Sequence, residues 1–270
     1  MCELLAVSAS RNVDVALSLT RLAAHGGSDG QPDGWGAAFL DATDAQVWRD
    51  PHPAKDSPWV ACLAAHPVST RLALAHIRRA TRGDIRLANT QPFTRELWGR
   101  LHVFAHNGMV PDIDRPEPSA RFRPLGDTDS EAAFCRFLDS IAETDGTPGV
   151  VRDRFANAAS LLRTFGPANL MYASADRLLI HADRRRQASG EFTPPGLWLL
   201  ERHCDASAPI AATAAGMDVS GSAVDVIVVA SVPLTNEAWR PLERGTILDI
   251  AGGRIEMEIR LKQDPSASAS

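Results

Sequence analysis

Apolar residues along the chain gather in short runs that glycine, proline, asparagine and aspartate separate. Runs of four to eight residues that are rich in Val, Leu, Ile and Ala and bounded by turn residues are typical of buried strands. Such runs occupy residues 2–8, 71–77, 101–106, 168–174, 178–181, 197–202 and 224–231. The pair 37–40 and 45–49, and the segments on either side of Gly252-Gly253, predict hairpins.

In the middle of the chain the period of the apolar positions changes to that of a helix. Within 129–143 the residues at helical spacing are Ala133, Phe134, Phe137, Leu138 and Ile141. We expect further helices at 150–165, after Ser57-Pro58, and after Asn12, which is expected to cap its helix. Strands cluster with hairpin turns and helices come in pairs. This order favours an α+β architecture with antiparallel sheets over alternating βαβ units.

The composition is that of an ordinary globular protein. The chain has 270 residues, 44% hydrophobic and 23% charged, with a net charge of −5. A mild acidic excess favours neither nucleic acid nor an anionic membrane as a partner. No apolar run is long enough to span a membrane, and the start lacks a secretory pattern, so we expect a cytoplasmic protein. Without a repeat or an interior linker, we expect one domain over 2–260 and a disordered tail at 265–270.

The cysteines and basic runs give no sign of a metal or a nucleotide. The spacing of the four cysteines suits neither a zinc ribbon nor a disulfide framework. Cys62 and His66 share one face of an expected helix, but no third ligand is evident. The arginine run 184–186 is expected to be a solvated loop, and no P-loop or G-x-G-x-x-G motif occurs. We therefore expect no metal ion and no organic cofactor.

Cys2 holds a chemically distinctive position. Removal of Met1 would make Cys2 the first residue, with a thiol of pKa about 8.5 beside an α-amine of pKa about 7.7–8.0. Such an amine can take the proton of its own thiol and return it to a leaving amine, so that one residue supplies both nucleophile and base. A buried cysteine that merely begins a strand is the alternative interpretation of Cys2.

Three further segments favour the chemical interpretation. His76-Ile77-Arg78-Arg79-Ala80-Thr81 leaves one expected strand, His106-Asn107-Gly108 leaves another, and Gly126-Asp127-Thr128-Asp129-Ser130-Glu131 opens a helix. Together with Cys2, and in this order, these segments are similar to the class II glutamine amidotransferase domain, the type with an N-terminal nucleophile. The resemblance covers most of residues 2–140 and continues through 168–240.

The resemblance implies a role for each of these residues. Cys2 is the implied nucleophile, and Asn107 and Gly108 are the implied oxyanion hole. Arg78 would bind the α-carboxylate of the substrate and Asp129 its α-ammonium. The residues that would shape the glutamine pocket are Thr81, Gly34 and Trp35. Each has an ordinary alternative as well: a surface arginine for Arg78, a helix cap for Asp129 and a turn for Asn107-Gly108.

The resemblance also implies a fold and a reaction. The fold would be the four-layer αββα N-terminal-nucleophile type, with two stacked antiparallel sheets. Cys2 would attack the side-chain amide of glutamine or of a γ-glutamyl compound, through a thioester. Because this domain fills nearly the whole chain, ammonia would either pass to a separate synthase subunit or be released by a plain amidohydrolase that cleaves γ-glutamyl conjugates. A catalytically weak glutamine-binding regulatory module is the alternative from another class.

The chain departs from the best-known members of that family at two positions. Those members begin Cys-Gly-Ile, whereas this chain has Cys2-Glu3-Leu4. They commonly carry tryptophan after the arginine that binds the carboxylate, where this chain has Arg79. The Cys-Glu-Leu start instead resembles a subgroup of small stand-alone bacterial proteins, which leaves the acceptor of the ammonia open.

Overall fold

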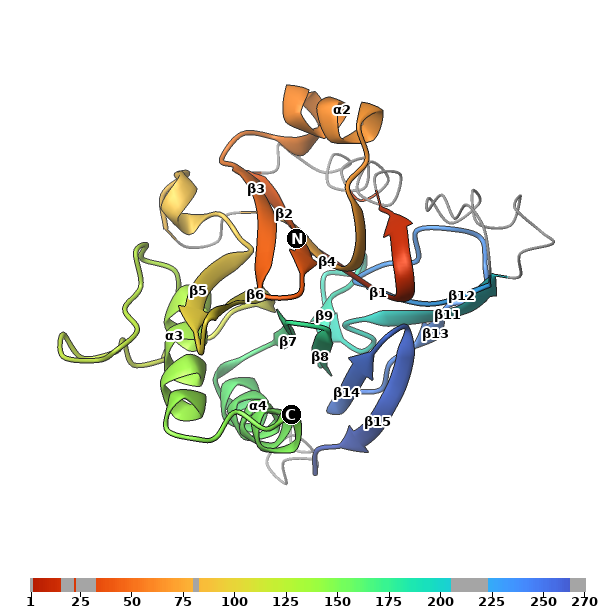
Figure 1. Ribbon diagram of the computed structural model, residues 1–270. Coiled ribbons are helices and arrows are strands. Elements are labelled where there is room, and N and C mark those ends of the chain that lie inside the picture. Colours follow the sequence, from red (N-terminus) through yellow and green to blue (C-terminus); the bar gives the residue numbers. More distant parts are fainter. Residues whose placement is uncertain (1, 16–21, 23–32, 80–82, 205–222, 263–270) are drawn as a thin grey trace.

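Two antiparallel sheets form the centre of the molecule in the computed structural model, which describes residues 2–15, 22, 33–79, 83–204 and 223–262 (Figure 1). The first sheet has seven strands in the order β13-β11-β12-β1-β4-β2-β3. The bounds of these strands are β1 Glu3–Asp14, β2 Trp35–Asp41, β3 Asp44–Asp50, β4 Ser69–Ile77, β11 Trp198–Cys204, β12 Val224–Ala230 and β13 Arg240–Pro241.

The second sheet has six strands in the order β15-β14-β8-β7-β6-β5. Its strands are β5 Phe93–Leu97, β6 Arg100–Gly108, β7 Ala168–Ser174, β8 Arg177–Ala182, β14 Thr246–Ala251 and β15 Arg254–Arg260. A separate short hairpin joins β9, Arg185–Arg186, to β10, Phe192–Thr193. Every strand pairing in both sheets is antiparallel, as the clustered hairpin turns predict.

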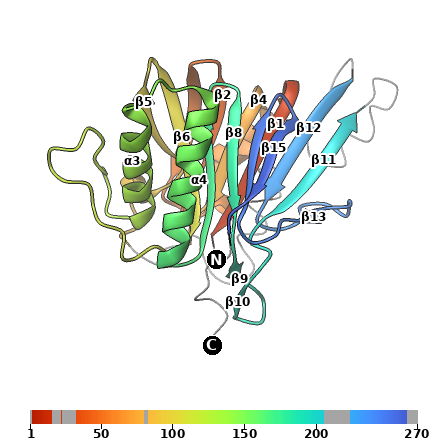
Figure 2. The same cartoon turned by 90° about the horizontal axis from the view of Figure 1, so that it is seen from below.

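Helices cover the outer faces of the two sheets. α3, Asp129–Ala142, and α4, Pro148–Phe165, lie side by side against the six-stranded sheet (Figure 2). α2, Pro58–Ala65, buries Val60 and Leu63 against the outer face of the seven-stranded sheet. Short 3-10 turns, η1 Ala54–Asp56 and η2 Leu87–Asn89, precede α2 and β5. Among the described residues these elements form the four layers that the αββα expectation requires.

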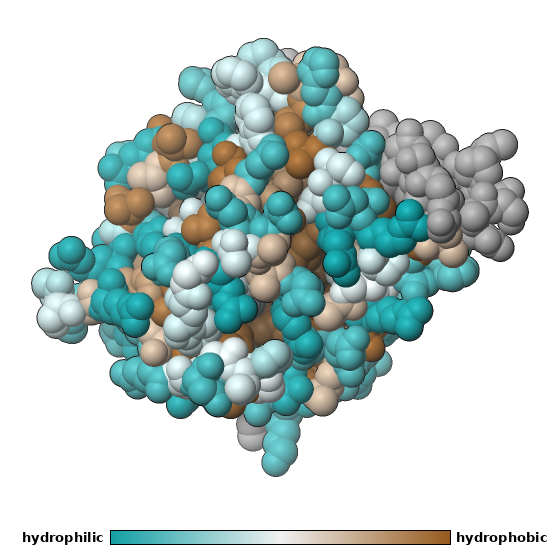
Figure 3. All heavy atoms as spheres, in the orientation of Figure 1, coloured by the Kyte–Doolittle hydropathy of each residue, from teal (hydrophilic) through white to brown (hydrophobic). Residues whose placement is uncertain are grey.

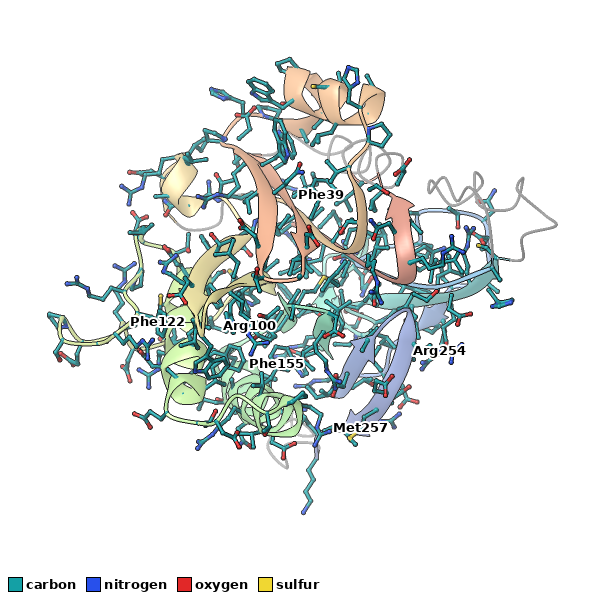
Figure 4. All side chains as sticks on the ribbon, in the orientation of Figure 1. Phe39, Arg100, Phe122, Phe155, Arg254 and Met257 are labelled. Atoms are coloured by element: carbon teal, nitrogen blue, oxygen red, sulfur yellow. The ribbon has the colours of Figure 1, made fainter. Side chains whose placement is uncertain are left out.

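The buried apolar side chains divide into three groups because successive strand residues point to opposite faces of a sheet. One group, which includes Phe39, lies outside the seven-stranded sheet, and another, which includes Phe155, lies under α3 and α4 (Figure 4). The third lies between the sheets and includes Leu74 and Val103. Polar side chains cover most of the face seen in Figure 3. The molecule therefore has apolar material on both sides of each sheet.

Gln91 lies two residues before β5 begins and extends the six-stranded sheet there. Its side-chain carbonyl accepts from the backbone N–H of His106 at 2.6 Å, and its side-chain amide donates to the carbonyl of His106 at 3.1 Å. β6 is thus held on this edge by a side chain where no further strand residue pairs with it.

The structure differs from the sequence-based expectation in two elements. Asn12 lies inside β1, which continues to Asp14, so it does not cap a helix. Asn12 is not a cap because the strand continues past it: after a bulge β1 pairs with β4 again, with Val13 opposite Thr70. β5 was missed because its sequence, Phe93–Leu97, contains three polar residues in five. The single domain over 2–260 stays a prediction, and the expected tail at 265–270 lies outside the described residues.

Candidate active site

The ends of five strands meet at one end of the two sheets. In the seven-stranded sheet, Ile77 near the end of β4 is paired with Glu3 of β1 on one side and Trp35 of β2 on the other. Cys2 and Gly34, which precede these partners, therefore flank Arg78. β12 ends nearby, because the N–H of Ser231 donates to the carbonyl of Leu4 at 3.0 Å. β6 contributes Asn107 from the other sheet, and the site thus draws on both sheets.

The sulfur of Cys2 lies against the backbone of Arg79. The N–H of Arg79 donates to Sγ at 3.1 Å, and the thiol donates to the Arg79 carbonyl at 3.3 Å. Burial raises the pKa of this thiol above its ordinary value, Glu3 raises it further, and the Arg79 N–H and the charge of Arg78 oppose the increase. The thiol is consequently protonated at neutral pH, and a base is needed to form the thiolate.

Arg78 is buried and held by backbone carbonyls. Its own N–H donates to the carbonyl of Gly34 at 2.8 Å, while its guanidinium donates to Gly83 at 3.0 Å and to the Asp33 carbonyl at 3.4 Å. Gly34 has φ of +125°, and a Cβ there would lie 2.9 Å from the carbonyl of Asp50, so the turn beside Arg78 requires glycine. Thr81, expected in the same pocket, lies outside the described residues.

Asn107 connects the two sheets at Cys2. Its side-chain amide donates to the carbonyl of Cys2 at 2.7 Å and reaches Ser231 Oγ at 3.4 Å. Its backbone carbonyl accepts from the Asn169 amide at 3.1 Å. The neighbouring Gly108 must be glycine, since a Cβ there would lie 1.7 Å from the carbonyl of Pro167. The side-chain amide of Asn107 thus lies beside Cys2, at a strand end whose next residue is confined by Pro167.

Asp129 begins α3 and bonds to the segment that follows Gly108. Its Oδ2 accepts from the N–H of Val110 at 2.8 Å and its Oδ1 from the N–H of Ser130 at 2.8 Å. The cap of the helix is Thr128, whose hydroxyl accepts from the N–H of Glu131 at 3.2 Å. The carboxylate of Asp129 is therefore tied to the segment after Gly108 rather than serving as the cap of α3.

Trp35 lies deeper than the other expected pocket residues. It begins β2, is fully buried, and belongs to the apolar group outside the seven-stranded sheet. The structure thus brings together Cys2, Arg78, Gly34 and Asn107 through hydrogen bonds, with Asp129 joined through the backbone after Gly108. The roles that the resemblance implies for these residues stay predictions.

Several buried polar residues of this region escaped the sequence analysis. The hydroxyl of Ser231 accepts from the N–H of Leu4 at 2.9 Å, in the place that a backbone carbonyl takes in a regular strand pairing. His76 is fully buried, and neither ring nitrogen has a hydrogen-bond partner among the described residues. Burial, with the nearby His106 and Arg78, lowers the pKa of His76 to about 3, so the ring is neutral. The signal in the sequence that could have pointed to these residues is that each is a polar residue at the end of an otherwise apolar strand.

The described part of the chain holds no group of three or more His, Cys, Asp or Glu residues placed to bind a metal ion. Within the same ranges, no helix combines the length and the apolar character that crossing a membrane requires.

The sequence as a whole is similar to known proteins. The family model described as "Glutamine amidotransferases class-II" matches residues 1–270. Over 252 residues the chain is 34% identical to "Putative glutamine amidotransferase YafJ" of Escherichia coli (strain K12), an alignment that covers 91% of this chain and 95% of that protein.

Two solved structures share the architecture. A "predicted glutamine amidotransferase from Pseudomonas aeruginosa PA01" superposes with a TM-score of 0.69 at 28% identity, over 95% of this chain and 100% of that one. Glutamine phosphoribosylpyrophosphate amidotransferase from B. subtilis gives a TM-score of 0.60 at 16% identity, over 97% of this chain and 50% of that one. The second likeness concerns the fold alone, and it confirms the expected αββα arrangement of two stacked antiparallel sheets.

Proposed function

We propose, because the chain belongs to the class II glutamine amidotransferases, that Cys2 with Met1 removed cleaves the side-chain amide of glutamine or of a γ-glutamyl compound. The thiolate of Cys2 adds to the amide carbon, and the carbon–nitrogen bond then breaks. The products of this first stage are a γ-glutamyl thioester and ammonia, or an amine. Water then cleaves the thioester and releases glutamate.

The α-amine of Cys2 supplies the base for the first stage. The thiol pKa is raised by its buried surroundings, so the sulfur carries its proton at neutral pH. A free amine on the same residue accepts this proton and gives it to the leaving nitrogen, which needs a proton to depart as ammonia. With Met1 retained, the amine would be an amide nitrogen, which has no basic lone pair.

The neighbouring residues stabilise charge and select the substrate. The amide of Asn107 and the N–H of Gly108 donate to the oxyanion of the tetrahedral intermediate, and loss of one such donor typically costs about 10²–10³ in rate. Arg78 binds the α-carboxylate, for which a planar guanidinium is well suited. Asp129 binds the α-ammonium, and Thr81 with Gly34 and Trp35 completes the pocket.

The observation that supports this proposal most strongly is the 2.7 Å hydrogen bond from Asn107 to the carbonyl of Cys2. It connects the residue with the thiol to the residue with the oxyanion donor, from two different sheets. The four cysteines of the chain are free thiols. A thiol nucleophile functions in a reducing compartment, and we therefore place the activity in the cytoplasm, with no metal or organic cofactor.

The test compares two forms of the protein that differ only at the N-terminus. One form begins at Cys2 after protease removal of a leader, and the other keeps a short leader on the α-amine. Intact mass verifies each form, and glutamate release is measured with glutamine and with a panel of γ-glutamyl amides. We expect release only from the form that begins at Cys2. Cys2→Ala abolishes it, whereas Cys62→Ala, which changes an exposed cysteine of α2, does not.

The same assay separates the alternatives. Faster release from γ-glutamyl conjugates than from glutamine, without a partner protein, identifies a conjugate hydrolase. Release from glutamine that rises when a synthase subunit co-purifies identifies an ammonia donor. Equal release from both N-terminal forms refutes the amine as base, and binding of glutamine without release by either form identifies a regulatory module.

A further inference from the structure

A buried ion pair lies directly beside the candidate nucleophile. Glu3 follows Cys2 in the chain, and its Oε1 accepts from Nη2 of Arg185 at 2.8 Å. Both residues are buried, with 7% of Glu3 and 9% of Arg185 exposed. Arg185 comes from the arginine run 184–186, which the sequence analysis expected to be solvated. Figure 2 shows β9, the strand of Arg185, near the beginning of β1.

Arg185 also contacts the strand end on the other side of Cys2. Its Nη1 donates to the carbonyl of Ser231 at 2.5 Å. The hydroxyl of Ser231 in turn accepts from the N–H of Leu4 at 2.9 Å and lies 3.4 Å from the Asn107 amide. One guanidinium therefore fixes the residue after the nucleophile and the residue that contacts the oxyanion donor.

Glu3 acts on the thiol directly, and Arg185 acts on Glu3. The carboxylate of Glu3 disfavours a thiolate next to it, and the guanidinium of Arg185 offsets that carboxylate. A further charged group near Cys2 is Arg78, which directly follows β4 and lowers the pKa of the thiol. β12 and β6 contribute the uncharged Ser231 and Asn107.

A buried ion pair is weak evidence for a contribution to stability. Its desolvation cost is high, and apolar residues of the same volume often stabilise a fold as well or better. A carboxylate that is buried next to a thiol nucleophile therefore calls for an explanation in terms of the site. The contacts of Arg185 with Glu3 and Ser231 supply one.

We propose that the buried Glu3–Arg185 pair is a positioning device that holds Cys2 and Asn107 in register and balances the charge beside the thiol. The inference rests on the proposed function, in which Cys2 is the nucleophile. Neither residue touches the substrate: both act through the backbone of β1 and through Ser231. The guanidinium fork supplies the geometry, and the opposite charges keep the thiol and the α-amine close enough in proton affinity for transfer in both directions.

The experiment measures alkylation of Cys2 by iodoacetamide against pH, in protein that begins at Cys2. Mass spectrometry of the peptide that contains Cys2 separates its reaction from that of the other cysteines. Glu3→Gln removes the negative charge and should lower the midpoint by about 0.5–1 pH unit. Arg185→Met removes the positive charge and should raise the midpoint, since it leaves the carboxylate of Glu3 without its ion-pair partner beside the thiol. Arg186→Met changes the exposed neighbour, which bonds only to the carbonyl of Gly190, and should leave the midpoint unchanged.

A second set of variants separates geometry from charge. Arg185→Lys keeps the charge but loses the fork, so the midpoint should stay as in the wild type while kcat for glutamate release falls about tenfold. The double variant Glu3→Gln with Arg185→Met carries neither charge. It therefore leaves no unpaired buried charge of the kind that could make a single variant misfold. Its midpoint should return to the wild-type value, with kcat still reduced.

Shifts of the same sign in Glu3→Gln and Arg185→Met, or no shift in either, overturn the charge balance. An unchanged kcat in both Arg185→Lys and the double variant overturns the positioning role. Because alkylation needs no substrate, the outcomes of the charge test are independent of the proposed function, whereas the positioning role is tested through glutamate release. The wild-type form that begins at Cys2 tests that function separately, by releasing glutamate or failing to do so.

Discussion

The centres of the strands and their ends at the candidate site differ sharply in chemistry. Between the sheets, β1 presents Leu4 and Ala6, β4 presents Leu72 and Leu74, and β6 presents Val103 and Ala105, all buried and aliphatic. Alternate residues of a strand share one face, so the next positions on that face are Cys2, His76 and Asn107. On β12, Ile227 and Val229 lead in the same way to Ser231.

This difference shows how one scaffold serves two purposes. Apolar packing between the sheets fixes the spacing of the strands and contributes most of the favourable free energy of folding. At the ends, several polar groups are held by specific partners, as Asn107 is by Cys2 and Arg185 is by Glu3. Stability and chemistry should therefore respond to different substitutions, even where the residues are two or three positions apart in one strand.

The largest effect should come from the apolar centre. Leu74→Ala opens a cavity between the sheets and should lower the free energy of unfolding by about 2–5 kcal/mol, as measured by urea denaturation. kcat of the remaining folded protein should stay within about twofold of the wild type. Leu161→Ala, at a residue of α4 that is 50% exposed, serves as the control and should cost far less. A large loss of kcat in folded Leu74→Ala would show that the centre and the ends are coupled.

The polar end should show the reverse behaviour. Asn107→Ala removes one oxyanion donor, and kcat for glutamate release should fall about 10²–10³-fold, which corresponds to about 2.7–4 kcal/mol of barrier. KM should change little, since the donor acts on the transition state. Asn236→Ala alters an exposed asparagine and should leave kcat unchanged. A proportionate loss of thermal stability in Asn107→Ala, with kcat intact, would make its role structural.

The smallest effect at neutral pH should come from His76, the polar residue that continues the apolar stripe of β4. Its pKa is lowered to about 3 in the folded state, below the ordinary value near 6.5. The unfolded state therefore binds more protons between these values, and stability is lost as pH falls from about 6.5 towards 3. His76→Leu should be close to neutral at pH 7 and should make the fall between pH 6.5 and 4 shallower.

Denaturation in urea at pH 7 and at pH 4.5 checks this expectation. Burial also lowers the pKa of His102 and of His181 to about 4, so part of the acid sensitivity should remain in the variant. His66→Leu changes an exposed histidine after α2 and serves as the control. It should leave the difference in unfolding free energy between pH 7 and pH 4.5 as in the wild type. An unchanged slope in His76→Leu would mean that the ring is solvated in the native protein.

Much of this organisation could be predicted from the sequence because apolar periodicity is a local signal. Most strands of both sheets and the helices α3 and α4 were predicted from it, and Cys2 with the Asn107-Gly108 and Thr128-Asp129 segments indicated the family. β5 was missed because it is short and buries only one face, so that polar residues such as the exposed Glu96 interrupt its apolar pattern. Asn12 misled because an N-cap residue and a polar residue in a bulged strand look alike in sequence.

The partners within the site could not be predicted, since they come from distant parts of the chain. Arg185 and Glu3 are separated by 182 positions, and their pairing depends on how β9 returns to the start of β1. Nothing in the arginine run 184–186 distinguishes the buried member from its exposed neighbour. Ser231 is likewise an ordinary serine until β12 places it opposite Leu4.

The bonds between Gln91 and His106 have a consequence for how this protein tolerates variation. Since one side chain holds the edge of β6, insertions or deletions within residues 84–88 can alter the surface near Arg78 without loosening β6, the strand that carries Asn107. Homologues that accept differently sized leaving groups would then be expected to vary in the length of this loop while keeping glutamine at its end. This loop is therefore a starting point for engineering the size of the leaving group that the protein accepts.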